Sequence, residues 1–474
     1  MTDSKLIELF RSLTTRQRSR FGEFLESPYF NKSGDCIRLY RHIQKYAPDF
    51  THAQLSKKAV LKKLDSEKPP DEKTLAYLAG KLMQLAETFL TIEAMLSDEW
   101  RRQMTLVRQY RELNLARHYR SARADMEKYL EKLPHRNIDF YREQLFAERL
   151  LYDHSDRNQR GFNEQLQTSA DALDVYYIAE KLRYACEMLN YEAVLNIHYR
   201  IAYLEDVLNW SAGEAYAQVP PIQVYRCLVL MLRSPEEPAL FEKARELIAK
   251  TEQHFSDAER KQFYTLLLNY CTRRINRFGD ARFLKEHLEI NKLLLQNGLM
   301  LEDGHIPPWD YTNIVAAGIK TEQAEWTRQF IETYRSKLPA QYADNTYRYN
   351  LAQYHYFMKN YGDAQHSLLQ VETSDVLLNV TVRSLLIKIY CETEQDELLH
   401  SYLEATRIFL HRNQLLDPQL KRQMQKFVEF TAKFGKVMPG DRERFHELLA
   451  QLPPASEMMH REWLAAQIRS KVER

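Results

Sequence analysis

The stretch Tyr361-Gly362-Asp363-Ala364 lies in an apolar framework that returns thirty-four residues later in the chain. The residues that match at this interval are Leu351, Ala364 and Leu368, followed by Leu385, Leu398 and Tyr402. A relative of the turn, Phe278-Gly279-Asp280-Ala281, lies upstream. A period of thirty-four residues is typical of a helix-turn-helix unit that stacks on copies of itself. The pattern predicts an all-α fold, a right-handed α-solenoid of stacked antiparallel helix pairs with no significant β-sheet.

The composition supports long helices joined by short loops. The chain has 474 residues, of which only 12 are glycine and 16 are proline. Strand-rich folds use glycine in tight turns, and both residues break helices, so their scarcity favours an all-helical chain. Apolar residues at helical spacing also occur in a compact helical bundle, which is the alternative architecture.

Cysteine usage and hydropathy predict a cytoplasmic protein without membrane association. No two of the five cysteines lie close in sequence, which excludes a CxxC motif and favours buried thiols in a reducing compartment. The first residues lack the pattern of a secretory signal. The longest uncharged apolar stretches, such as Leu228 to Leu232, are far shorter than the roughly 18 residues needed to span a bilayer.

The chain divides by sequence pattern into three regions. Residues 1–98 form a basic N-terminal helical region, in which Thr14 and Gln17 predict a capping box and Pro69-Pro70 a break. Residues 99–437 form the predicted solenoid, with the clearest repeats at 265–413. Residues 438–474 are expected to be capping helices at the C-terminal end.

The repeat resembles the tetratricopeptide repeat. Leu351-Ala352 corresponds to the large and small residues that open the first helix of that family's unit, and Tyr361 and Ala364 to the aromatic and alanine that pack the second. Two preceding units are expected to contain Ile314, Thr327 and Ile331, and Leu268, Phe278 and Ala281. Arg348 and His355 replace the tryptophan and tyrosine that the family prefers. The whole chain, with Ser27-Pro28-Tyr29-Phe30-Asn31 near its start, also resembles a group of uncharacterised bacterial helical-repeat proteins.

This resemblance implies a binding groove lined by the first helix of each unit. Carried onto this chain, the groove positions are Tyr270, Arg273, Arg274, Tyr349, Gln353, Tyr356, Arg383 and Tyr390. Tyrosine and arginine often anchor protein interfaces. The leading hypothesis is therefore a non-catalytic adaptor that binds a protein or peptide. The family's lysine and asparagine clamp for peptide carboxylates is not matched by Tyr349 and Gln353.

The sequence contains no local catalytic, cofactor or metal motif. No two glycines are closer than five residues, which excludes GxGxxG and the Walker loop, since both need clustered glycines around a phosphate. GxSxG and HExxH are also absent. We expect no cofactor, no metal and no enzymatic activity, and an active site assembled from distant residues is the open alternative.

Charge is uneven and suggests a second hypothesis. Residues 1–123 contain 23 Lys and Arg against 15 Asp and Glu, whereas the remainder contains 44 against 50. An excess of this kind can mark an anion-binding region. Within the arginine-rich segment that follows residue 100, only Arg101, Arg108 and Arg111 share one helical face. A nucleic-acid-associated regulator that uses these arginines is the alternative function.

Overall fold

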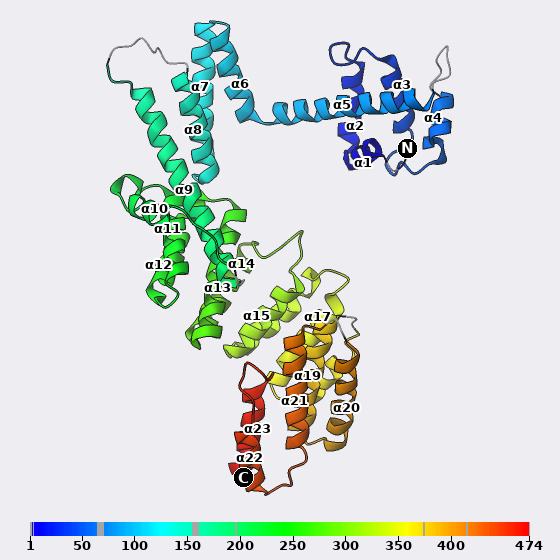
Figure 1. The fold of residues 1–474 in the computed structure, drawn as a ribbon, viewed down its shortest axis with the longest axis vertical. Coiled ribbons are helices and arrows are strands. Elements are labelled where there is room, and N and C mark those ends of the chain that lie inside the picture. Colours follow the sequence, from blue (N-terminus) through cyan, green and yellow to red (C-terminus); the bar gives the residue numbers. More distant parts are fainter. Residues whose placement is uncertain are drawn as a thin grey trace. The chain divides into compact units, whose positions relative to one another are not determined.

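The computed structural model describes residues 2, 4–63, 71–153, 161–194, 197–372, 375–413 and 416–473. These residues form 23 α-helices and four short 3-10 helices, and no strand beyond one isolated bridge between Glu302 and His305. The all-α solenoid prediction is confirmed, since helices pack on their neighbours along the chain (Figure 1). The expected Pro69-Pro70 break lies outside the described residues.

Contacts divide the chain into two compact units, Met1–Tyr176 and Tyr177–Arg474. Helix α9 (Glu164–Val194) runs across the boundary between them. The other helices of the first unit are α1 (Lys5–Ser12), α2 (Thr15–Glu26), α3 (Gly34–Gln44), α4 (Lys57–Lys63), α5 (Glu72–Ser97), α6 (Glu99–Glu112), α7 (Ala116–Lys132) and α8 (Ile138–Asp153).

The first unit contains two apolar clusters. Helices α1–α5 enclose one, in which Phe10 and Phe21 are fully buried. The capping box predicted at the start of α2 is confirmed, because Thr14 and Gln17 exchange side-chain and backbone hydrogen bonds. Helices α6–α8 enclose the other cluster around Trp100 and Met126. Asp98 ends α5, and its side chain caps α6.

The second unit is a succession of neighbouring helix pairs. Its helices are α10 (Leu204–Trp210), α11 (Pro220–Arg233), α12 (Pro238–Thr251), α13 (Asp257–Phe278), α14 (Arg282–Gln296), α15 (Pro308–Lys320), α16 (Ala324–Thr333), α17 (Ala343–Phe357), α18 (Tyr361–Leu369), α19 (Val376–Glu392), α20 (Asp396–Arg412), α21 (Pro418–Phe434), α22 (Arg442–Ala450) and α23 (Arg461–Glu473). The short 3-10 helices of the chain are η1 (Ala53–Leu55), η2 (Glu214–Tyr216), η3 (Glu252–His254) and η4 (Arg335–Lys337).

One turn geometry links α15 to α16, α17 to α18 and α19 to α20. The turn residues Glu322, Lys359 and Glu394 are left-handed, with φ of 60°, 60° and 55°. At the last turn the Gln395 N–H donates to Tyr390 O at 2.9 Å, and the Glu394 N–H donates to Cys391 O. This pair of bonds is the Schellman motif, which satisfies carbonyls at a helix end. The same turn makes Gln395, the residue after Glu394, the N-cap of α20.

The position of each turn determines which residues of the following helix are buried. The residue four positions after each N-cap is buried, and these residues are Thr327, Ala364 and Leu399. The prediction that Leu398 corresponds to Ala364 is wrong, because Leu398 is 51% exposed. The two left-handed turn residues, at 359 and 394, are thirty-five positions apart, so the second helix of that pair is shifted by one residue from the thirty-four-residue pattern.

Helices α21, α22 and α23 end the chain's described part. They close a core in which Phe427, Leu464 and Ile468 pack with the last repeats. Helix α21 begins with Asp417, whose side chain accepts hydrogen bonds from Gln419 N and Leu420 N. The C-terminal helices therefore continue the apolar core of the repeats rather than forming a separate one.

Candidate functional site

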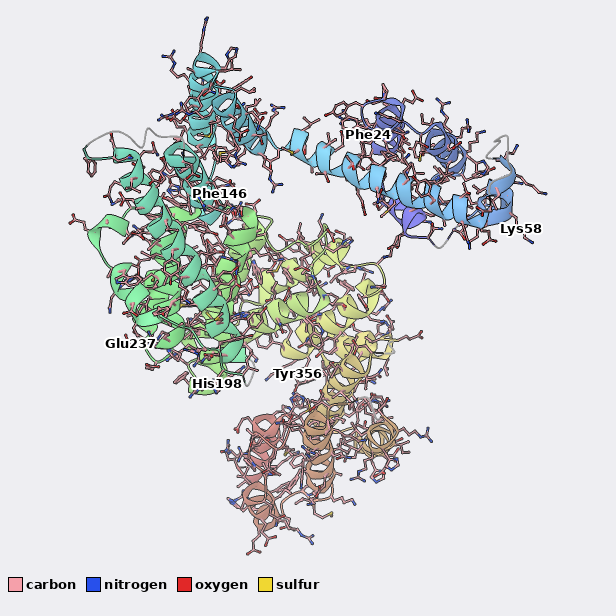
Figure 2. The ribbon with its side chains drawn as sticks, turned by 45° about the horizontal axis from the view of Figure 1, so that its top comes forward. Phe24, Lys58, Phe146, His198, Glu237 and Tyr356 are labelled. Carbon is pink, nitrogen blue, oxygen red and sulfur yellow. The ribbon has the colours of Figure 1, made fainter. Side chains whose placement is uncertain are left out.

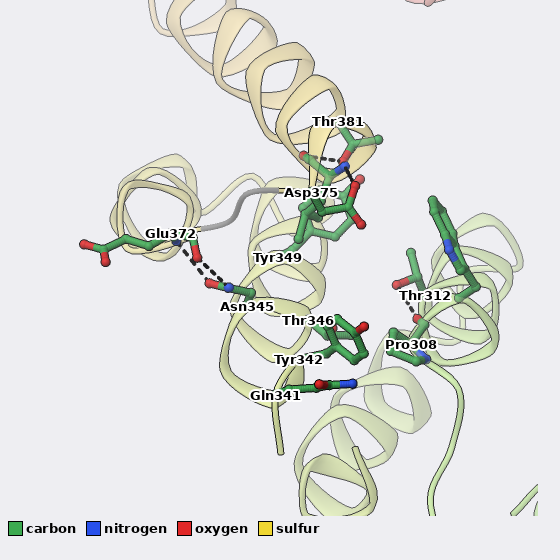
Figure 3. A pocket seen from close by; sticks show the side chains of 12 residues that line it. Pro308, Thr312, Gln341, Tyr342, Asn345, Thr346, Tyr349, Glu372, Asp375 and Thr381 are labelled. Carbon is green, nitrogen blue, oxygen red and sulfur yellow. Dashed lines mark hydrogen bonds between the residues drawn. The ribbon is translucent and has the colours of Figure 1, made fainter. Parts of the chain in front are cut away.

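A cavity of about 280 Å³ opens where the first turns of α15, α17 and α19 meet. Figure 3 shows it between Pro308 and Thr312 on α15, Tyr342 to Tyr349 along the start of α17, and Asp375 to Thr381 at the start of α19. We name this the α15–α17–α19 cavity. These are the first helices of three successive pairs.

Local sequence fixes the walls of the cavity. Pro308 occupies the first turn of α15, where a proline costs no helical hydrogen bond. The side chain of Asp375 caps α19 by accepting from the backbone of Leu377 at 2.8 Å and of Leu378 at 3.1 Å. The Asn345 amide donates to Glu372 O at 2.6 Å and accepts from Glu372 N at 3.0 Å. This two-way bond ties the segment before α19 to α17 in the manner of a paired strand.

Three aromatic side chains, Trp309, Tyr342 and Tyr349, line the cavity. Trp309 is 57% exposed and Tyr342 is 50% exposed, so both rings are open to a partner. Tyr349 lies deeper, and burial raises the pKa of its hydroxyl, an effect that a hydrogen bond with Thr381 opposes. Rings of this kind combine a large apolar face with a polar edge and serve as contact residues at interfaces.

The cavity has little charge of its own. No lysine or arginine is among its lining residues. The Asp375 carboxylate is engaged in capping α19, and the Glu372 carboxylate points away from the cavity (Figure 3). Among the described residues the Gln341 side-chain amide has no hydrogen-bond partner, which leaves its donor and acceptor for a bound molecule. The site suits an uncharged group that carries apolar surface and a few peptide-like polar atoms.

Only one of the eight groove positions expected from the sequence, Tyr349, lines this cavity. Gln353 and Tyr356 follow it on α17. The Gln353 amide donates to Asn350 Oδ1 at 3.3 Å, and the Tyr356 hydroxyl donates to Glu392 on α19. Both side chains are therefore occupied by neighbours within the chain.

The two expected positions on α19 pack against α20. The Arg383 guanidinium lies 4.4 Å from the ring centroid of Phe409 and 5.6 Å from that of Tyr402. Tyr390 is buried and meets Tyr402 edge to face at 5.5 Å. These contacts hold a helix pair together and leave Tyr390 without an open surface.

The three expected positions on α13 are not brought to the cavity. Tyr270 is buried, and its hydroxyl donates to Pro235 O at 3.0 Å. Arg274 is buried beside it, donates to the same carbonyl at 3.1 Å and forms an ion pair with Asp280 at 2.8 Å. Arg273 is half-buried, and desolvation together with neighbouring Arg277 lowers the pKa of its guanidinium. Tyr270 and Arg274 therefore join α13 to the segment that precedes α12.

Sequence reasoning missed Trp309, Tyr342 and Asn345. Pro308 and Trp309 begin α15. A usable signal was present, since a proline in the first turn of a predicted helix marks where that helix starts. Helix starts in neighbouring repeats lie side by side, so their residues could have been grouped.

The arginines expected to bind polyanions lie in the first unit. Arg101 and Arg108 line a second cavity, of about 1030 Å³, along α6 and α8. Arg111 is not among its lining residues, and its guanidinium lies 5.6 Å from the Tyr119 ring. Arg101 also forms an ion pair with Asp98 at 3.0 Å.

Within the described ranges no cluster of three or more His, Cys, Asp or Glu side chains has a geometry suited to a metal ion. The five cysteines are free thiols, and four of them are buried, as expected. Burial raises the pKa of Cys391 to about 12. Across the same described residues, no helix has both the length and the apolar character required to cross a bilayer.

Comparison of the chain with models of protein families, with curated proteins and with solved structures found no match.

Proposed function

We propose that the protein is a non-catalytic interaction scaffold that binds a protein partner through the α15–α17–α19 cavity. The observation that carries the proposal is an aromatic cavity without lysine or arginine, formed by the starts of three successive first helices in the stack. Its volume of about 280 Å³ is at the lower limit of the roughly 300–1,000 Å³ typical of small-molecule sites. A cavity of that size suits one anchoring side chain from a protein partner.

The chemistry of the lining indicates the type of segment that binds. Trp309 and Tyr342 offer exposed rings to an aliphatic or aromatic anchor. The free amide of Gln341 and the hydroxyl of Tyr342 can exchange hydrogen bonds with the backbone of an extended peptide. With no cationic side chain in the lining, an uncharged apolar anchor is favoured over an acidic one.

The tetratricopeptide resemblance supports the proposal. In that family the first helices of successive units form the binding face, and Tyr349 is one of the positions carried over. Kinship with that family and with the uncharacterised bacterial helical-repeat proteins belongs to the same proposal. We place the protein in the cytoplasm, since its five thiols are unpaired.

The experiment is affinity purification of the tagged full-length chain from its native cell, with and without nuclease. The test variant is Trp309→Ala/Tyr342→Ala, which removes two exposed rings and leaves the core intact. The matched control is Tyr203→Ala/Trp210→Ala, because both residues are also exposed and lie outside the cavity. A stoichiometric protein that resists nuclease, is lost with the test variant and is kept with the control supports the proposal. Material that disappears with nuclease favours the nucleic-acid alternative instead.

A further inference from the structure

Helices α6 and α8 border a cavity of about 1030 Å³ in the first unit, and the end of α5 closes one side of it. We name it the α6–α8 groove. Its apolar floor consists of Trp100, Met104, Phe146 and Leu150. Figure 2 labels Phe146. This residue is 46% exposed, whereas Trp100 and Leu150 are buried. An exposed phenylalanine above a buried apolar layer is a contact surface that another apolar face can cover.

The floor is held in place by a polar bond between its two helices. The Trp100 indole N–H donates to the Glu143 carboxylate on α8, and the Trp100 ring stacks on Tyr129 with centroids 5.7 Å apart. Glu143 is also paired with Arg142 at 2.7 Å. The groove is therefore preformed, and its one central acid is already neutralised.

Both helices contribute arginines to the groove. Arg101 and Arg108 stand on α6, and Arg142 and Arg149 stand on α8. In each pair the residues are seven positions apart, which places them two turns or about 10 Å apart along the helix axis. Each of the two helices thus contributes two arginines to the lining of the groove.

Two of these arginines have no partner among the described residues. Arg101 is paired with Asp98, and Arg142 with Asp139 and Glu143. Arg108 and Arg149 are exposed and make no ion pair or hydrogen bond with described residues. The two unpaired guanidinium groups therefore stand on opposite helices of the groove, Arg108 on α6 and Arg149 on α8.

We propose that the α6–α8 groove binds an acidic amphipathic helix of a partner protein. Such a helix lays its apolar stripe on the floor and presents Glu or Asp on its two flanks, one toward Arg108 on α6 and the other toward Arg149 on α8. Single-stranded nucleic acid matches the groove less well, because it has one phosphate line and stacks its bases on several aromatic faces. Here Phe146 is the one exposed aromatic ring in the lining.

The length of the walls sets the length of the ligand. Helices α6 and α8 have 14 and 16 residues. At 1.5 Å per residue they offer about 21–24 Å, so a helix of about four turns fills the groove. This surface is separate from the α15–α17–α19 cavity, and either can fail its test without affecting the other.

The test is a display selection of 16-residue helical peptides on the full-length protein. Positions on the apolar stripe vary among Leu, Phe, Met and Ala, and flanking positions vary among Glu, Gln and Lys. We expect enrichment of Glu on both flanks. The enriched peptide should bind Arg108→Gln/Arg149→Gln about tenfold more weakly and lose affinity with added salt. The matched control, Arg117→Gln/Arg120→Gln, removes two exposed arginines of α7 outside the groove and should bind normally.

Three results would overturn the proposal. One is a selection with no enriched peptide, or with no preference for Glu on the flanks. Another is an equal loss of affinity in the two double variants, which would indicate a general charge effect. The third is binding of a 16-nucleotide oligo-dT, tested in parallel, that depends on Arg108 and Arg149 and is tighter than the binding of any peptide.

Discussion

The indole N–H of Trp463 donates a hydrogen bond of 2.5 Å to Glu392 Oε1, joining the C-terminal helix α23 to α19 across 71 residues of sequence. The hydroxyls of Tyr356 and Tyr361 donate to the same carboxylate, the latter at 2.6 Å. One carboxylate thus collects three neutral donors from three helices. Charge-assisted hydrogen bonds of this type are stronger than neutral ones, so Glu392 stabilises the packing of α23 against α19.

Removing the indole donor should loosen α23. Trp463→Phe keeps an aromatic ring and deletes one hydrogen bond to a charged group, which is worth about 1.5–3 kcal/mol. We expect the backbone amides of Arg461–Glu473 to exchange with deuterium at least about tenfold faster, since 1.4 kcal/mol is a factor of ten. Hydrogen-exchange mass spectrometry of the full chain measures this. Trp309→Phe is the control, and exchange in α23 that is the same in both variants would contradict the role of Glu392.

Acid should destabilise the same region through His460. The Nε2 atom of His460 is buried without a partner, and desolvation, with a further contribution from Lys388, lowers the pKa of this histidine to about 3. Between pH 6.5 and 3 the unfolded chain therefore binds a proton that the folded chain does not. The contribution of His460 to the free energy of unfolding is fully present above pH 6.5. Below pH 6.5 the free energy of unfolding falls by up to about 1.4 kcal/mol per pH unit.

The variant His460→Asn should flatten this dependence between pH 6.5 and 5, above the range in which most carboxylates titrate. Asparagine suits the site because His460 has φ of 52°, a left-handed conformation that asparagine tolerates. The midpoint of thermal unfolding, measured at half-unit pH steps, gives the two slopes. Parallel slopes for the variant and the unaltered protein would show that His460 does not titrate in this way.

The contact between α15 and α16 should not accept a methyl group at Gly318. A Cβ there would lie 2.2 Å from Thr327 Oγ1. Overpacking of this kind costs about 1–3 kcal/mol, so Gly318→Ala should lower the midpoint of thermal unfolding. Thr327→Ala removes the clashing oxygen and should restore part of the loss in the double variant.

Gly80 provides the control for that substitution. It lies within α5 and has no neighbour within 4 Å of the position that a Cβ would take. Because alanine favours helix over glycine by about 1 kcal/mol, Gly80→Ala should stabilise the first unit slightly. A similar loss of stability at both glycines would refute the steric account of Gly318.

The fold was predictable because its determinants are local. Scarce glycine, helical spacing and the capping box of Thr14 and Gln17 depend on residues a few positions apart. The sequence pattern placed the buried residue of α20 at Leu398, one position before the residue that is buried, Leu399. The reason is that the left-handed turn at Glu394 depends on backbone geometry, which apolar spacing does not reveal.

The sites were less predictable because their walls come from segments distant in sequence. Helical spacing alone predicts that Arg101 and Arg108 share a face of one helix. It does not predict that the arginines of α8 line the same groove. Tyr270 has the residue type of an interface anchor, yet its hydroxyl is bound by a carbonyl 35 residues away. The Asn345–Glu372 tie that closes the α15–α17–α19 cavity spans 27 residues and has no sequence signature.

The most direct test of the proposed scaffold role is photo-cross-linking in the native cell with p-benzoylphenylalanine at position 342, inside the cavity. The control carries the same group at position 203, where Tyr203 is exposed and lies outside the cavity. We predict that one protein cross-links from position 342 and not from position 203, and that Trp309→Ala reduces its yield. The absence of a protein adduct at 342, or the same adducts from both positions, would contradict the claim that this cavity binds a protein partner.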